Sequence, residues 1–142
     1  MDRKPNVEKV DLDVLESRFG FSFPDDLREF YLRGNGGRPM PNLFPKEGEY
    51  FSVHEFLPIK HGMRGALFED TYADLISEGG FFPKMAIPFA IDAGGDYFYY
   101  SLEPGKFGEI CFYQSDYVND PSRAIVHLAP SLREFLDGLV VE

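Results

Sequence analysis

The sequence lacks several features that whole classes of protein require. Among 142 residues it has one cysteine, Cys111, and no tryptophan. A single cysteine excludes an intramolecular disulfide, and we expect neither a cysteine-based zinc site nor an oxidising compartment. The N-terminus is charged, and no apolar run approaches the roughly 18 residues that a membrane span needs. The sequence therefore predicts a cytoplasmic protein with no signal segment and no membrane contact.

Basic residues are also scarce. Lysine and arginine number 14 against 24 aspartates and glutamates, which gives a formal net charge of −10. Because nucleic-acid binders usually carry a basic patch, we expect no direct contact with nucleic acid. An acidic surface instead favours solubility, or it steers a basic protein partner toward the chain. The length predicts one domain over residues 1–142. The aromatic share of 16% calls for a thick core, a partner surface, or both.

The N-terminal third predicts a hairpin of two helices. In residues 11–19 the apolar side chains fall on one face, and Gly20 ends the helix. The second helix spans residues 24–33, with Pro24 in its first turn and acidic side chains at its N-terminal end. Three glycines and Asn35 follow it directly, and these residues accept the positive φ angles of a sharp turn.

The remaining two thirds predict an antiparallel sheet and two more helices, so the fold class is α+β. Turn residues separate three strands of a meander, and a capping box of Ser131 and Glu134 starts the last helix. Pro88 in the first meander strand predicts an edge or a bulge. The expected segments are a loop at 38–49, a strand at 50–57, a helix at 67–77, strands at 85–91, 97–102 and 109–114, an extended piece at 123–128, and a helix from 132 onward.

Three blocks of sequence carry a family resemblance, and they cover nearly the whole chain. They are the first helix with the 23–37 segment, the 87–96 segment with the two strands after it, and residues 129–136. In this order they resemble the SUKH superfamily and, within it, the Smi/Knr type, the cell-wall-assembly-regulator family. Phe23 stands where the family usually has leucine. The middle of the chain, about residues 40–80, carries no family motif.

The resemblance implies a single SUKH-like domain, a mostly antiparallel mixed sheet packed by helices. It also implies a role. Stand-alone bacterial members resemble non-catalytic immunity proteins, which bind and block a polymorphic or contact-dependent toxin, often a nuclease with a basic surface. The fungal relatives are regulatory scaffolds, so a protein-interaction module that binds a cellular partner is the alternative. An enzyme ranks third, and we expect no cofactor and no metal.

Residue types with catalytic or metal-binding potential have simpler interpretations in the sequence. Asp92 and Asp96 flank two glycines and an alanine, which is typical of a hairpin turn rather than of a calcium loop. The histidines, His54, His61 and His127, match no metal-binding motif. Cys111 alternates with apolar residues in a strand and has no cationic sequence neighbour, so we expect an inert thiol.

The aromatic strand 97–102 suggests where a partner binds. Adjacent strand residues point to opposite faces, so Phe98 and Tyr100 share one face and Tyr97 and Tyr99 the other. The second face is either covered like the first or exposed as a tyrosine-rich surface, the residue type enriched in interfaces. The candidate partner-binding residues are Asp92, Asp96, Tyr97, Tyr99, Glu103, Glu109, Tyr113 and Asp116.

Overall fold

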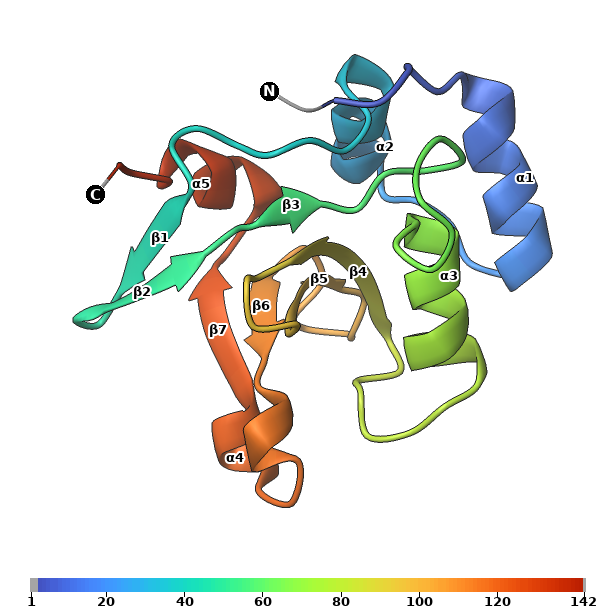
Figure 1. The fold of residues 1–142 in the computed structure, drawn as a ribbon. Coiled ribbons are helices and arrows are strands. Elements are labelled where there is room, and N and C mark those ends of the chain that lie inside the picture. Colours follow the sequence, from blue (N-terminus) through green and yellow to red (C-terminus); the bar gives the residue numbers. More distant parts are fainter. Residues whose placement is uncertain (1–2, 142) are drawn as a thin grey trace.

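Most of the helices pack on one face of a five-stranded antiparallel sheet in the computed structural model, which describes residues 3–141 (Figure 1). The helices are α1 (Lys9–Phe19), α2 (Asp25–Arg33), α3 (Phe68–Tyr72), α4 (Pro121–Ala124) and α5 (Leu132–Asp137), with a π turn at Ala73–Ser77 and a 3-10 turn at Ser115–Tyr117. The strands are β1 (Leu43–Lys46), β2 (Glu49–Ser52), β3 (Glu55–Phe56), β4 (Ala86–Ile91), β5 (Tyr97–Ser101), β6 (Ile110–Tyr113) and β7 (Ile125–Ala129).

The main sheet has the strand order β3-β4-β5-β6-β7, and β1 and β2 form a separate hairpin. Every pairing between these named strands is antiparallel. The predicted α+β class and the predicted meander are therefore confirmed. The bulge predicted at Pro88 is also present, because the β4–β5 register shifts between Pro88 and Ala90. Within residues 3–141, none of the helices combines the length and the apolar character that a bilayer crossing requires.

The two N-terminal helices confirm their sequence signals. α1 buries Leu12 and Leu15, and it ends at Gly20, whose φ of 73° is left-handed. α2 begins directly after Pro24 and buries Leu27 and Tyr31. Arg28 of α2 forms ion pairs with Asp13 and Glu16 of α1. The hairpin is thus held by charge on its outer side and by apolar packing on its inner side.

The predicted strand at 50–57 is wrong in its extent, and so is the loop at 38–49. The segment 43–52 forms the β1–β2 hairpin, whose turn residues Glu47 and Gly48 have φ angles of 50° and 84°. The chain then leaves this hairpin, and the two residues of β3 join the main sheet beside β4. The segment predicted as one strand is therefore divided between two sheets. Such a division depends on which strand edges are free nearby, and local residue pattern does not encode it.

Two predictions near the other helices need smaller changes. The middle helix is confirmed at 68–77, with its second half as a π turn. The extended piece predicted at 123–128 begins only at Ile125, because α4 occupies the four residues before it. Pro121 at the start of α4 fits the first turn of a helix. A helix this short has no apolar period, so the sequence offered no signal for it.

The main core lies between the helices and the inner face of the sheet. Phe98, Tyr100 and Phe112 extend from that face. Phe135 of α5 contacts Phe98 and Phe89, with ring centroids 5.6 Å and 6.1 Å apart. On the α2 side, the Tyr100 hydroxyl lies 2.7 Å from an Asp26 carboxylate oxygen, to which it donates a hydrogen bond. The inner-face residues predicted from strand alternation are therefore confirmed as core.

Asn35 connects three segments that are distant in sequence. Its fully buried side-chain NH2 donates hydrogen bonds to the carbonyls of Pro5, at 3.0 Å, and Ile59, at 2.8 Å. Its side-chain oxygen accepts from the Ile59 N–H at 2.7 Å. The Asn35 carbonyl also accepts from the Lys4 N–H at 2.9 Å. The N-terminal segment, the end of α2 and the 57–60 segment therefore meet at one amide.

The glycines after Asn35 allow the close approach that these bonds need. Gly36 has a φ of 72°, and a Cβ at this position would lie 2.8 Å from Cβ of Pro58. The Gly37 carbonyl accepts a hydrogen bond from the Phe56 N–H of β3 at 2.9 Å. The turn predicted from composition is confirmed, and its function is to place β3 against the end of α2.

We predict that Asn35→Ala lowers the free energy of unfolding by about 2–4 kcal/mol, because it leaves buried backbone donors and acceptors without partners. Urea denaturation monitored by circular dichroism measures the change. Asn119→Ala is the matched control, since Asn119 is exposed, and it should cost less than about 0.5 kcal/mol. Equal losses in the two variants would contradict this role for Asn35.

Candidate functional site

The candidate site lies on the face of the main sheet opposite the core helices, which we call the outer face. Register places Tyr97 opposite Tyr113, and Tyr99 opposite Cys111. Cys111 in turn lies opposite His127 of β7. Directly opposed residues of an antiparallel pair point to the same face. The outer face therefore carries the side chains of Tyr97, Tyr99, Cys111, Tyr113 and His127.

The tyrosines of the outer face are mostly covered. The ring of Phe82, in the segment between the π turn and β4, lies 5.4 Å from the ring of Tyr99 and 5.2 Å from that of Tyr113. Tyr99 is only 5% exposed and Tyr113 only 8%. Burial raises the pKa of the Tyr99 hydroxyl well above its usual range. Of the two alternatives left open by the sequence, a sheet covered on both sides is the one that the structure contains.

The predicted acidic residues surround this covered patch at its two ends. Asp92 accepts hydrogen bonds from the N–H groups of Gly94 and Asp96, at 3.0 Å and 2.8 Å. Asp96 accepts from the Ser115 hydroxyl at 2.6 Å. These two carboxylates therefore shape the β4–β5 turn, as predicted. Asp116, in the 3-10 turn, is exposed at the same end of the sheet.

At the opposite end of the outer face, Glu103 is exposed and Glu109 is partly exposed. Both lie in or beside the connection between β5 and β6. Of the eight candidate residues, the three tyrosines therefore lie on the outer face and the acidic residues lie at its two ends, so the eight do not form one cluster. The acidic side chains remain at the rim, and two of the tyrosines are removed from solvent.

Two exposed apolar side chains beside the outer face escaped the sequence reasoning. Phe81 is 74% exposed and Met85 is 49% exposed. They flank Phe82 in the segment that covers the tyrosines, and the Met85 carbonyl accepts a hydrogen bond from the Leu102 N–H at 2.8 Å. The segment follows two glycines and has no helical or strand period. Only the packing of Phe82 reveals which of its neighbours remain exposed.

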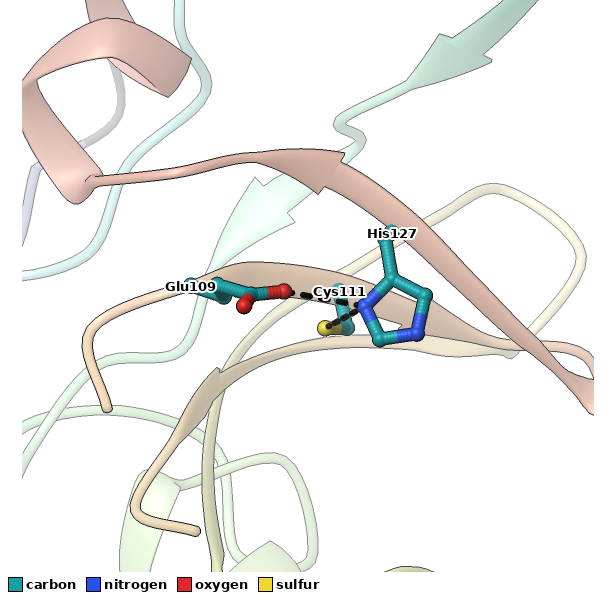
Figure 2. Close-up of side chains that lie close together, drawn as sticks. All are labelled: Glu109, Cys111 and His127. Atoms are coloured by element: carbon teal, nitrogen blue, oxygen red, sulfur yellow. Dashed lines mark hydrogen bonds and ion pairs between the residues drawn. The ribbon is translucent and has the colours of Figure 1, made fainter. Parts of the chain in front are cut away.

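A compact cluster of Glu109, Cys111 and His127 lies at the β6–β7 side of the outer face (Figure 2). Nδ1 of His127 is 3.0 Å from a Glu109 carboxylate oxygen and 3.5 Å from Sγ of Cys111. Glu109 and Cys111 are two residues apart at β6, so their side chains share a face. His127 joins them because it opposes Cys111 in the neighbouring strand. The sequence separates His127 from Cys111 by 16 residues, and no spacing motif connects them.

The cluster does not have the geometry of a nucleophilic triad. In such a triad the imidazole accepts the nucleophile's proton on one nitrogen while the carboxylate orients the other nitrogen. Here the thiol and the carboxylate both face Nδ1. Burial also raises the pKa of the Cys111 thiol to about 11, and only 1% of the residue is exposed. The predicted inert thiol is consistent with both observations.

A groove of about 800 Å³ lies between α2, the 34–41 segment and α5. Its lining includes Phe30, Leu136 and the exposed Met40. Its charged lining is balanced between three arginines, Arg3, Arg33 and Arg133, and three carboxylates, Asp26, Glu29 and Asp137. The groove therefore has no net sign of charge, in contrast to the acidic rim of the outer face.

Comparison with family models gives one match. The model described as "SMI1 / KNR4 family (SUKH-1)" aligns with residues 6–138. The chain belongs to this family. The SUKH resemblance predicted from three sequence blocks is thereby confirmed. A comparison with curated proteins finds no match.

Two of the three SUKH blocks contribute to the scaffold of the fold. The block at residues 23–37 supplies the Asn35 hydrogen bonds and the turn beside β3. The block at 129–136 supplies Ser131, whose hydroxyl caps α5 by accepting from the Glu134 N–H at 3.1 Å. Phe81 and Met85 lie outside the three blocks or at their edge.

We predict that native Cys111 reacts slowly with iodoacetamide at pH 8 in a buffer with a chelator. The rise in thiol pKa from 9.0 to about 11 lowers the thiolate fraction about a hundredfold, and burial slows the reaction further. The same chain unfolded in guanidinium chloride is the control, because it presents the same single thiol. Mass spectrometry gives both rates. Equal rates in the native and unfolded chains would contradict the buried position of Cys111.

Proposed function

We propose that this chain is an immunity protein that binds a cognate bacterial toxin of the polymorphic or contact-dependent type, and blocks it by occlusion. Membership of the SUKH-1 family over residues 6–138 is the observation that carries the proposal. The formal net charge of −10 adds to it, because an acidic protein complements the basic surface of a nuclease. In this proposal the protein acts in the cytoplasm of the toxin-producing cell and its kin.

The proposed mechanism uses binding alone. The cluster of Glu109, Cys111 and His127 has a single nitrogen facing both partners, which does not support acid–base or nucleophilic chemistry. The turn carboxylates Asp92 and Asp96 are engaged by backbone and serine donors. We therefore assign no catalytic residue to the protein.

We further propose that the outer face is the toxin-binding surface. Its acidic rim, which includes Glu103 and Asp116, would attract a basic partner over a distance of about one Debye length, roughly 8–10 Å. Phe81 and Met85 then offer apolar side chains that a partner can cover. Large apolar anchors surrounded by polar groups are typical of the residues that dominate binding energy in interfaces. Tyr97, which is partly exposed, extends this surface toward the Asp96 turn.

The function is tested by co-expression with the toxin domain encoded by the neighbouring gene. We predict that co-expression restores growth of cells that the toxin alone kills, and that the two proteins co-purify as a complex. The association rate of that complex should fall about tenfold or more between roughly 0.05 M and 0.5 M salt, because screening removes the electrostatic attraction. A rate indifferent to salt would contradict the steering mechanism.

The alternative function, a regulatory scaffold, leads to a different outcome in the same experiment. A scaffold would not restore growth, and affinity purification from the native cell would recover a signalling protein rather than a toxin. Restored growth of the toxin-expressing cells without a co-purified complex would overturn the immunity proposal. Recovery of a signalling protein from the native cell would overturn it as well.

We predict that Phe81→Ala weakens the toxin complex about tenfold, as expected for loss of an aromatic anchor. The ring is 74% exposed, so the melting temperature should stay unchanged. Tyr50→Ala is the matched control, because Tyr50 is a 66% exposed aromatic residue on the β1–β2 hairpin. Isothermal titration calorimetry measures both affinities. A larger effect from Tyr50→Ala would place the interface on the hairpin instead.

A further inference from the structure

Three metal-ligating side chains converge on one point of the outer face (Figure 2). Glu109 offers a carboxylate oxygen, Cys111 a sulfur and His127 a ring nitrogen, and these atoms all lie within 4.8 Å of one another. Opposed positions in neighbouring strands hold Cys111 and His127 together, and the i, i+2 spacing brings Glu109 to the same side. The side chains are thus arranged by the sheet itself rather than by a mobile loop.

We propose that Glu109, Cys111 and His127 form a zinc site, in which the carboxylate, the thiolate and Nδ1 of the imidazole bind one ion. On binding, the thiol proton leaves to solvent, and the neutral imidazole keeps its proton on Nε2. The thiolate and the carboxylate together neutralise the two positive charges of the ion. This proposal does not rest on toxin binding, because it follows from the cluster alone.

Two of the three interatomic distances in the cluster fit a tetrahedral zinc ion. Zinc binds sulfur at about 2.3 Å and histidine nitrogen at about 2.0–2.1 Å, so two such ligands lie about 3.5 Å apart. Sγ of Cys111 and Nδ1 of His127 are separated by 3.5 Å. Nδ1 and the Glu109 oxygen are 3.0 Å apart, only slightly closer than an ideal tetrahedral pair. A metal ion can therefore enter with small side-chain adjustments.

The donor set indicates zinc rather than magnesium or calcium. Those two ions prefer shells made of oxygen ligands, whereas a thiolate and an imidazole suit zinc. Without a metal ion, one Nδ1 faces both Sγ and the carboxylate oxygen, and its single proton serves only one of them. A metal ion satisfies all three atoms at once.

The surroundings supply an outer shell and a fourth position. Tyr99 lies opposite Cys111 in the neighbouring strand, and polar groups beside a ligating sulfur help to orient it. A cavity of about 240 Å³ adjoins the cluster, with Tyr99, Glu103 and Ser122 among its lining residues. It can admit a water molecule or a partner's side chain as the fourth ligand. Three protein ligands with one open position are typical of zinc sites that exchange a ligand.

Titration of the reduced, chelator-treated full-length chain with zinc chloride tests the proposal. Calorimetry should give one ion per chain, and His127→Gln should weaken binding at least about tenfold. This variant is the primary one, because the His127 side chain is 51% exposed and its loss leaves the core intact. Glu109→Gln keeps the shape of its side chain and should weaken binding as well.

Two controls separate this site from general binding of zinc by histidine. His54→Gln and His61→Gln each remove an imidazole outside the cluster, and both should keep the wild-type zinc affinity.

Cobalt(II) should produce a thiolate-to-cobalt charge-transfer band that Cys111→Ser abolishes. Zinc should raise the melting temperature of the wild type but not of His127→Gln. Absence of zinc binding in the wild type, or unchanged affinity in His127→Gln, would overturn the proposal.

Discussion

The fold depends on one buried amide, the side chain of Asn35. Its three hydrogen bonds join the N-terminal segment and the 57–60 segment to the end of α2. The glycine turn that follows pairs with β3, and β3 in turn pairs with β4. Because a buried amide without partners is costly, the arrangement is satisfied only when all three segments are in place. The position of the helical hairpin on the sheet is therefore tied to the edge of the sheet itself.

This scaffold separates stability from surface chemistry. The inner face and the Asn35 turn hold the core and the buried hydrogen bonds, whereas the outer face holds carboxylates, exposed apolar side chains and the Glu109–Cys111–His127 cluster. Phe82 changes the character of that face, because it buries the tyrosines that strand alternation leaves exposed. The exposed groups around the outer face are then carboxylates and two apolar side chains, rather than tyrosines. A surface of this kind can vary without disturbing the core.

The predictable parts of the fold are those that local sequence encodes. The amphipathic period and the glycine end of α1, the helix of residues 25–33 and the turns of the meander all depend on neighbours within a few residues. The division of the 43–56 segment between two sheets was not predictable, because it depends on which strand edges are nearby. α4 was missed because four residues are too few for a period. The exposure of Phe81 was not predictable either, because it depends on how the neighbouring Phe82 packs.

The sequence by itself determined the α+β class, the SUKH-1 family, the acidic charge and the two faces of the aromatic strand. The fold class, the charge and the two strand faces follow from composition and short-range periodicity, whereas the family follows from the resemblance of three sequence blocks. Only the tertiary structure decided that both of those faces are covered and which residues meet on the outer one. His127 reaches Cys111 because the β6–β7 register opposes them, and a shift of one residue would point His127 to the other face. Register is set by the packing of the whole sheet, so no spacing in the sequence predicts the Glu109–Cys111–His127 cluster.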